Sequence, residues 1–260
     1  MNNMMPILFV GHGSPMNAIE NNKYTKNFSR IANGIKRPTA IACISAHWVT
    51  QGTKVTSMEN PKTIHDFYGF PRELYDIEYK ASGSMEIAKK VQDLLLPISV
   101  ELNTDWGLDH GTWSVLRHMY PNANIPVVQI SIDYTKSTEY HYNIAKKMKL
   151  LRQEGVLIIG SGNIVHNLSM IDFEKIETNY GFDWAIKTQK NINDNIINNN
   201  FEPLLNYLKQ GDSFNLAIPT PEHFLPLIYI LGLKEDNEKI EFFNNELVGG
   251  SISMTSIKIS

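Results

Sequence analysis

The sequence predicts a single α/β domain in which a central mixed, mostly parallel sheet is flanked by helices. Short apolar runs rich in β-branched residues alternate along the chain with amphipathic segments of helical period. No linker and no internal repeat divides the chain, so we expect residues 1–260 to form one domain. Three of the apolar runs lead to a histidine, and in open α/β sheets ligands bind outside the carboxyl ends of the strands.

The expected strands and helices follow one another in the order typical of such a sheet. Ser84 has the side chain of a helix N-cap and is followed by an acidic residue in the first turn. The strands are predicted at residues 7–10, 41–46, 54–58, 100–102, 127–132, 156–159, 240–243 and 251–259. The helices are predicted at residues 23–32, from Ser84 onward, and at 113–119, 137–152, 184–198, 203–208 and 224–231.

Composition and charge exclude several classes of protein. With 42% hydrophobic and 20% charged residues, the chain has the make-up of an ordinary globular protein. Its net charge of −3 and its lack of a basic block argue against a nucleic-acid partner. Cys43 is the only cysteine, which excludes an internal disulfide and a cluster of thiolate ligands. No segment has the length of a membrane span and no secretory signal is visible, so we expect no membrane partner and a cytoplasmic location.

Three histidines are predicted at the same edge of the sheet. His12 follows the first apolar run in a turn that contains two glycines and a proline. His47 follows the run 41–46, and His166 follows the run 156–159 after a short glycine-containing turn. Their shared position favours a metal or proton-transfer centre over three separate structural roles.

Two further candidates lie outside the strands. His223 is expected in the first turn of a helix, where the helix dipole disfavours a cation and leaves the neutral imidazole that a metal requires. The alternative for His223 is an ordinary helix start. His110 follows Asp109, which either orients the imidazole ring or is only a turn residue.

The remaining histidines carry weaker signals. His65 lies in the loop 60–71, whose aromatic side chains either line a pocket or cover the core. We predict that this loop forms part of a pocket wall and that His65 binds substrate. His118 and His141 lie in predicted helices and need only structural roles. Neutral nitrogen ligands without thiolates suit Fe(II), zinc, copper or nickel, and three such ligands with open positions are typical of a catalytic metal site.

Six segments together match one family. The segments are Gly-His-Gly-Ser-Pro-Met-Asn (11–17), Ser-Ala-His-Trp (45–48), Thr-Ile-His-Asp-Phe-Tyr-Gly-Phe-Pro (63–71), Asp-His-Gly-Thr-Trp (109–113), Ser-Gly-Asn-Ile-Val-His-Asn-Leu (161–168) and Pro-Thr-Pro-Glu-His-Phe-Leu-Pro-Leu (219–227). Taken jointly the motifs are specific, although each alone is weak. With them the chain closely resembles the class III extradiol ring-cleavage dioxygenases, in the branch that is similar to 4,5-DOPA extradiol dioxygenase, from about residue 6 to the C-terminus.

The resemblance implies a catalytic domain with one divalent metal ion, Fe(2+) or Zn(2+), held by His12, His47 and His223. It implies that His166 is the catalytic acid/base, close enough to serve as a fourth ligand, and that His110 is catalytic and contacts substrate and O2. The implied substrates are a small-molecule catechol, of the 4,5-DOPA type or related to it, and O2. We expect Glu222 to support His223 and not to bind the ion itself.

Two other interpretations fit the same residues. A zinc-dependent hydrolase or lyase could use the three-histidine site, with a metal-bound water as its nucleophile. A metal-binding or interaction protein could use the histidines only to stabilise its fold. Turnover of a catechol in the presence of Fe(II) would separate the dioxygenase from both.

Overall fold

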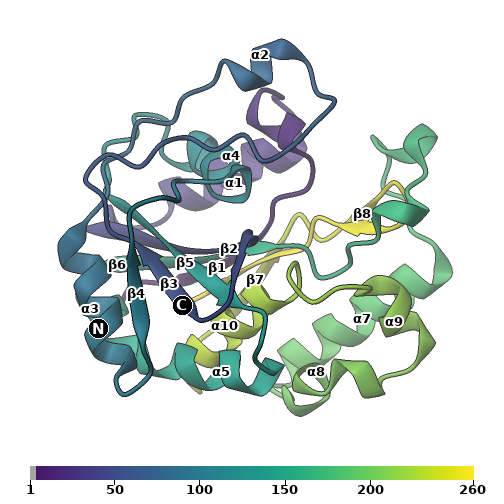
Figure 1. Ribbon diagram of the computed structural model, residues 1–260. Coiled ribbons are helices and arrows are strands. Elements are labelled where there is room, and N and C mark those ends of the chain that lie inside the picture. The colour runs from purple at the N-terminus through teal and green to yellow at the C-terminus, as the bar shows by residue number, and fades with distance from the viewer. Residues whose placement is uncertain (1–3) are drawn as a thin grey trace.

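The centre of the molecule is an eight-stranded mixed sheet (Figure 1), and the computed structural model describes residues 4–260. The strand order is β4-β3-β5-β2-β6-β1-β10-β7. The inner strands β5, β2, β6 and β1 are parallel to one another. Strand β10 is antiparallel to β1, β7 is antiparallel to β10, and β3 is antiparallel to β5. The predicted mixed, mostly parallel sheet flanked by helices is therefore confirmed. The strands are β1 (Ile7–Gly11), β2 (Ala40–Thr50), β3 (Thr53–Thr56), β4 (Val100–Asn103), β5 (Val127–Asp133), β6 (Val156–Gly162), β7 (Ile240–Phe243) and β10 (Ser256–Ile259), with β8 (Leu247–Val248) and β9 (Ile252–Ser253) forming a separate pair.

Ten α-helices surround the sheet in the described part of the chain. They are α1 (Lys23–Asn33), α2 (Arg72–Tyr75), α3 (Met85–Leu95), α4 (His110–Met119), α5 (Thr138–Lys147), α6 (Lys149–Gln153), α7 (Asp183–Ile197), α8 (Glu202–Leu205), α9 (Asp212–Ala217) and α10 (Leu225–Leu233). None of them has the length and apolar character that a membrane crossing requires.

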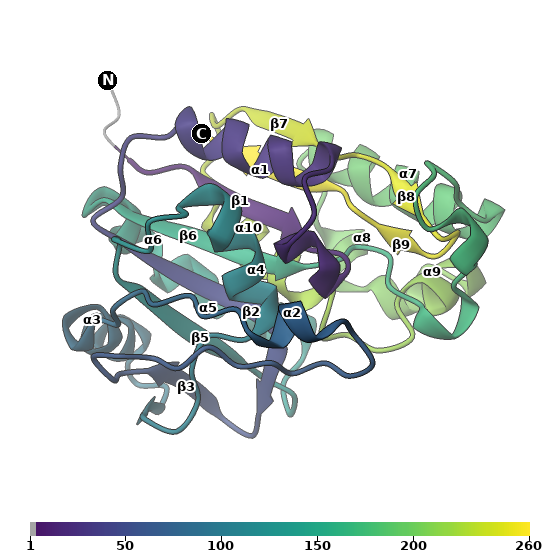
Figure 2. The same ribbon diagram turned by 90° about the horizontal axis from the view of Figure 1, so that it is seen from above.

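Alternating side chains divide the interior into two cores, one on each face of the sheet. In β1, Ile7 and Phe9 belong to one hydrophobic cluster, and Leu8 and Val10 belong to the other. This follows from the period of two in a strand, which sends neighbouring side chains to opposite faces. Helices α1 and α4 cover the face of Leu8, and α3, α5 and α10 cover the face of Ile7 (Figure 2). Because both faces are covered, the inner strands are mostly apolar, and their polar residues gather toward the carboxyl ends of β2, β5 and β6.

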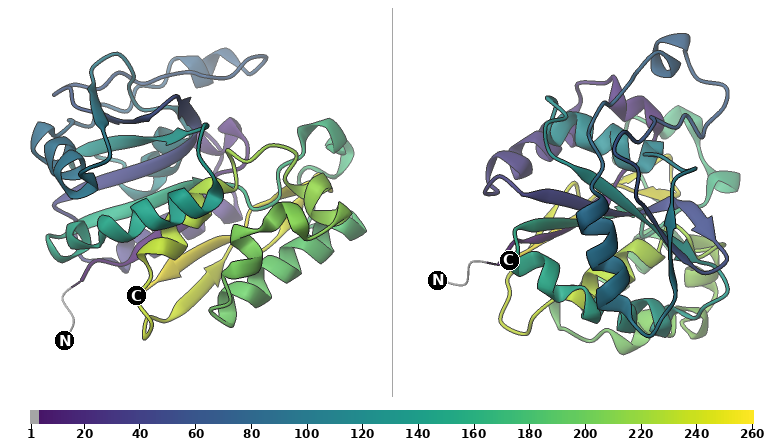
Figure 3. Two further views of the ribbon diagram at one scale, coloured as in Figure 1. Left: turned by 60° about the horizontal axis from the view of Figure 1, so that its bottom comes forward. Right: turned by 60° about the vertical axis from the view of Figure 1, so that its left-hand side comes forward.

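Helix α10 lies in the middle of its core. All nine of its residues are buried, and it packs on β6, β1 and α5. A helix that is apolar on every side is stable only when it is surrounded in this way. The helices α7 to α9 group beside the C-terminal strands, at the opposite end of the sheet from α3 (Figure 3).

Most predicted elements occur where the sequence placed them, and Ser84 caps α3 by accepting from the backbone N–H of Ile87. The predicted helix 137–152 is divided, because Met148 ends α5 and a tightened turn separates it from α6. The predicted strand 251–259 is likewise divided into β9 and β10. Helices α2 and α9 are short and were not predicted.

Candidate metal centre

His12 and His47 reach the same place because their strands are separated only by β6. His12 directly follows β1, and its backbone N–H donates to the carbonyl oxygen of Gly162 at the end of β6. His47 lies in the second half of β2, within the stretch between Ile44 and Val49 where the register with β5 shifts. Such irregularities re-aim side chains near functional sites. The two rings therefore meet at the carboxyl edge of the sheet, as predicted.

Two glycines allow the other histidines to approach this edge. A Cβ atom at Gly111 would lie 2.6 Å from the Ser45 Oγ and 3.0 Å from the His47 ring, so its absence lets α4 bring His110 against β2. A Cβ atom at Gly162 would lie 2.2 Å from the carbonyl oxygen of His223. That same oxygen accepts from the Asn163 backbone N–H at 2.9 Å. His223 itself lies in the turn before α10, which begins at Leu225, and not in the first turn of the helix as expected.

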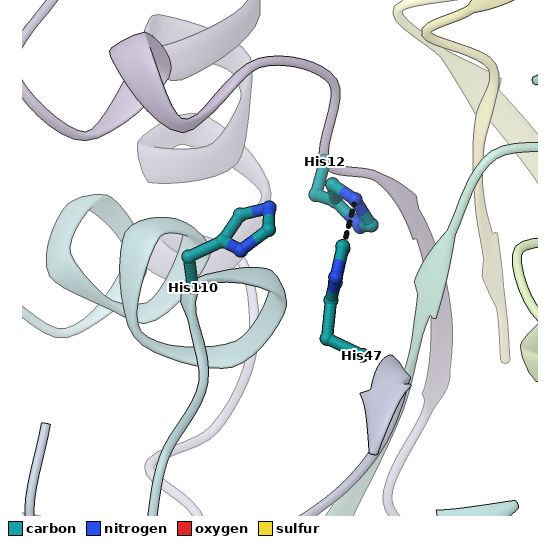
Figure 4. A group of neighbouring side chains, drawn as sticks. All are labelled: His12, His47 and His110. Carbon is teal, nitrogen blue, oxygen red and sulfur yellow. Dashed lines mark hydrogen bonds between the residues drawn. The ribbon is translucent and has the colours of Figure 1, made fainter. Parts of the chain in front are cut away.

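The resulting cluster consists of two adjacent groups of metal-binding side chains. The nitrogen atoms of His12, His47 and His110 lie within 4.8 Å of one another (Figure 4), and so do those of His166 and His223 with an oxygen of Glu222. The two groups touch, because the His223 ring centroid is 5.4 Å from that of His12 and 5.0 Å from that of His47. Of the predicted ligands, His12 and His47 therefore belong to the first group and His223 belongs to the second.

The oxygen beside each Nδ1 determines which nitrogen of each candidate ligand carries the proton. The Nδ1 of His12 lies 3.0 Å from the Ser161 Oγ, which already donates its hydrogen to the carbonyl oxygen of Gly111. Ser161 must therefore accept from His12 Nδ1–H. The Nδ1 atoms of His47 and His223 each lie beside a carboxylate, of Asp66 at 3.2 Å and of Glu222 at 3.3 Å. Because carboxylates only accept, all three rings keep an unprotonated Nε2.

The unprotonated Nε2 atoms of His12 and His47 lie close together, an arrangement that a cation between them would stabilise. The Nε2 atoms of His12 and His47 are 3.1 Å apart, and with both Nδ1 atoms protonated neither Nε2 has a hydrogen to share. Two lone pairs at this distance repel unless a proton or a metal ion lies between them. The site therefore fits a metal ion held by neutral imidazoles.

Ring spacing identifies the third ligand. Imidazoles that bind one ion through bonds of ~2.0–2.1 Å at tetrahedral angles have centroids about 5.2 Å apart. The three distances among His12, His47 and His223 are 5.0, 5.0 and 5.4 Å, close to this value. His110 lies only 3.9 Å from His47, so these two rings pack against each other and do not converge on one point.

The electrostatics of the cluster keep its rings neutral. Burial lowers the pKa of His12, His47 and His223 well below the ordinary value, and the neighbouring imidazoles lower it further. Burial also lowers the pKa of His166 to about 4, against an opposing effect of Glu222. All four rings are therefore unprotonated near pH 7, which is the form that binds metals and accepts protons.

His110 and His166 flank the three candidate ligands. His110 is 4% exposed and packs on His47, whereas His166 stacks face to face on His223 with centroids 3.5 Å apart and an angle of 8° between the rings. The stacking distance of 3.5 Å between the His166 and His223 rings is far shorter than the spacing of about 5.2 Å that tetrahedral ligands of one ion would have, whereas His12 and His47 are close to that spacing. Glu222 accepts from Thr220 and from His223, which suits a supporting position.

The residue that orients His110 is Asp66, not Asp109. Asp66 accepts from the His110 backbone N–H through Oδ1 and from the His110 Nδ1–H through Oδ2, each at 2.9 Å. Asp109 instead caps α4 and accepts from Ser45 and Gln129. The sequence signal for Asp66 is its place next to His65 in the motif at residues 63–71, but residue type alone does not show which of two neighbours turns inward.

The other histidines lie outside the cluster. The His65 Nε2 is 3.0 Å from the carbonyl oxygen of Ile77, and its ring contacts Phe67 and Trp113. His65 also lines an open cavity of about 450 Å³. Among the described residues that line this cavity there is no histidine of the candidate metal centre. His118 bonds the carbonyl oxygen of Asn17, and His141 bonds the hydroxyl of Tyr229, which agrees with the structural roles expected for them.

Only some aromatic side chains of the loop 60–71 are buried toward the histidine cluster. Phe67 is 6% exposed, and its ring centroid lies 5.6 Å from that of His110. Phe70 packs on Phe67 at 5.4 Å, whereas Tyr68 is 92% exposed. The loop thus brings one aromatic ring next to the cluster.

Comparisons with known proteins identify the family of the chain. The family model described as the catalytic LigB subunit of aromatic ring-opening dioxygenase matches residues 5–256. The chain is 44% identical over 259 residues to 4,5-DOPA dioxygenase extradiol of Escherichia coli (strain K12), which covers 98% of this chain and 94% of that protein. It is 37% identical over 266 residues to 4,5-DOPA dioxygenase extradiol of Beta vulgaris, covering 99% and 97%. The crystal structure of an uncharacterized protein, JW3007, from Escherichia coli K12 superimposes with a TM-score of 0.86 at 40% identity, covering 98% of this chain and all of that one. The chain therefore belongs to the LigB family of aromatic ring-opening dioxygenases.

Proposed function

We propose that this protein is an extradiol dioxygenase that inserts O2 into a catechol and opens the ring beside the diol, giving a muconic semialdehyde. The observation that carries the proposal is the convergence of His12, His47 and His223, each with its Nδ1 beside an acceptor oxygen and its Nε2 free. The names of the relatives support 4,5-DOPA or a related catechol as the substrate.

The proposed ligands hold one divalent ion, Fe(2+) for the dioxygenase reaction. When bound, the ion supplies Lewis acidity toward the two catechol oxygens and, as Fe(2+), redox chemistry with O2. Three protein ligands leave coordination positions for both substrates. His166 is a further candidate ligand in the resting protein, although its stacking on His223 favours a role in proton transfer.

His166 is the proposed acid/base. It is neutral near pH 7 and lies against a ligand, so it can accept a proton from a catechol hydroxyl and return it during ring opening. Burial of the cluster also removes competing water, which strengthens each hydrogen bond made there.

His110 is the proposed contact to substrate and O2. With Nδ1–H donated to Asp66, it presents Nε2, which can take up a proton and then donate a hydrogen bond. Phe67, next to His110, supplies an apolar surface for the aromatic ring. The predicted contact between His65 and substrate stays a prediction, and the position of its ring makes Phe67 the better-placed member of the loop.

Anaerobic loading with Fe(2+), followed by oxygen uptake with a panel of catechols under 18O2, tests the proposal. We expect a coloured semialdehyde that carries both labelled atoms, from the Fe(2+) form and not from the Zn(2+) form. Hydrolysis or elimination with the Zn(2+) form, without oxygen uptake by the Fe(2+) form, would overturn it in favour of a zinc hydrolase or lyase.

A further inference from the structure

We propose that Asp66 is a positioning residue that holds the ligand His47 and the substrate-facing His110 in one fixed arrangement. This inference rests on the proposed function for the role of His110, but its effect on metal binding can be measured separately. Asp66 belongs to neither group of candidate metal ligands.

One carboxylate makes three contacts to the two histidines. Its Oδ2 lies 2.9 Å from the His110 Nδ1 and 3.2 Å from the His47 Nδ1, and its Oδ1 accepts from the His110 backbone N–H at 2.9 Å. The side chain is 16% exposed, so water competes little for these bonds. The Oδ2 thus accepts the His110 Nδ1–H and places its negative charge against the His47 Nδ1.

The backbone brings Asp66 to this position. The segment before it runs parallel to the segment before α4: Leu108 donates to the carbonyl oxygen of Lys62 at 2.9 Å, and Ile64 donates to that of Leu108 at 2.7 Å. The indole N–H of Trp113 on α4 also donates to the carbonyl oxygen of Ile64. Asp66 follows the paired residue Thr63 by three positions, and His110 follows its partner Leu108 by two, which brings them side by side.

The consequence is that both rings have the same tautomer and linked orientations. Because the Nδ1 atoms of both rings lie against Asp66, the Nε2 of each lies on the far side of its ring, toward substrate or metal. Carboxylates that bond a ligand histidine in this way commonly raise metal affinity 10–100-fold. Here the same oxygen also fixes a second, non-ligand histidine, so a shift of either ring disturbs the other.

No other described acidic group can take this role. Asp109, the nearest in sequence to His110, is fully buried and is occupied by Ser45, Gln129 and the backbone of Thr112. Glu222 serves His223 on the other side of the cluster.

Asp66→Asn tests the proposal, with Asp76→Asn as the matched control because Asp76 is a largely exposed carboxylate nearby in the chain. We expect Asp66→Asn to weaken Fe(2+) or Zn(2+) affinity 10–100-fold by competition with a chromogenic chelator and to lower kcat with the best catechol at least tenfold. The control should change neither. Wild-type metal affinity in Asp66→Asn would overturn the proposal.

A double-mutant cycle with His110→Ala separates positioning from general support of the fold. With His110 absent, Asp66→Asn should lower kcat no further but should still weaken metal binding through His47. Additive losses in kcat would contradict the link to His110. If the Asn variant does not fold by circular dichroism, Asp66→Glu provides the same test, since it retains the charge and displaces the oxygens. Weakened metal binding in a protein that consumes no catechol would reject the proposed function and still support the positioning of His47.

Discussion

At the scale of single residues, the partner of each Nδ1 decides what the histidine can do. The Nδ1 atoms of His12, His47 and His223 lie beside three different acceptors, a serine hydroxyl and two carboxylates, and all three rings are left with the same free nitrogen. From the strand ends the sequence predicted His12, His47 and His166 at one edge of the sheet, with His223 as a further candidate, and the set of three ligands came from the family resemblance. It could not predict Asp66, because His65 and Asp66 are adjacent in an extended loop and only the folded backbone determines which one faces the cluster.

Replacing single histidines should separate ligands from their neighbours. We expect His223→Ala to lose metal, because its ring has the spacing of a ligand to both His12 and His47. His110→Ala should retain metal to within a few-fold, since its ring packs against His47 and does not converge with it. Metal content after gel filtration measures both, and the reverse pattern would make His110 the third ligand.

His166→Gln should affect turnover much more than metal binding. The residue stacks on His223 and is neutral near pH 7, so its loss removes the proposed acid/base. We expect kcat to fall about a hundredfold or more. Metal titrations of the same preparation provide the control, and a loss of metal equal to the loss of activity would make His166 a ligand.

At the scale of secondary structure, close backbone contacts set the positions of the functional turns. The alternation of apolar runs was sufficient to predict the strands of the sheet and their carboxyl edge. The break at Met148 and the start of α10 beyond His223 were not predictable, because a single tightened turn leaves the apolar spacing almost unchanged.

Gly162→Ala should displace His223 and so disturb the candidate metal centre, although Gly162 itself is not a ligand. The added Cβ would lie 2.2 Å from the His223 carbonyl oxygen, so the turn before α10 must move away from β6. We expect a loss of about 1–3 kcal/mol in the free energy of unfolding, together with weaker metal binding. Urea denaturation and metal titration measure the two effects.

Gly34→Ala is the matched control for this substitution. Gly34 has a φ of −87°, and a Cβ there would meet nothing closer than 3.5 Å. Equal effects of the two alanine variants would show that the contact between Gly162 and His223 has no special part in the site.

At the scale of the whole molecule, the protein buries neutral histidines in its core as well as at the metal centre. His141 on α5 is completely buried and bonds the hydroxyl of Tyr229 on α10, which joins the two helices beneath the sheet. Burial lowers the pKa of His141 from 6.5 to about 4. Between these two pH values, His141 is therefore protonated in the unfolded chain and neutral in the folded chain.

The sign of the pH dependence follows directly. Above pH 6.5 His141 is neutral in both states, so it does not make the free energy of unfolding depend on pH. Below pH 6.5 protonation of His141 stabilises the unfolded state, and the free energy of unfolding falls. The metal-free protein should lose about 1.4 kcal/mol of unfolding free energy per pH unit from this residue as the pH falls from 6.5 toward 4. His141→Gln should reduce that slope, as measured by urea denaturation at several pH values.

The control for the pH measurement is His118→Gln. The His118 ring is only partly buried, and burial lowers its pKa less strongly than that of His141, so the slope should change less. Identical slopes in the wild type and in His141→Gln would show that this buried ring does not determine the acid sensitivity.

The most direct test of the proposed centre is anomalous diffraction from crystals of the Fe(2+)-loaded protein. We predict one ion per chain, bonded at about 2.0–2.1 Å by the Nε2 atoms of His12, His47 and His223, with His110 and Asp66 outside bonding distance. An ion bound between His12, His47 and His110, or one held by His166 and Glu222 away from β1 and β2, would contradict this account.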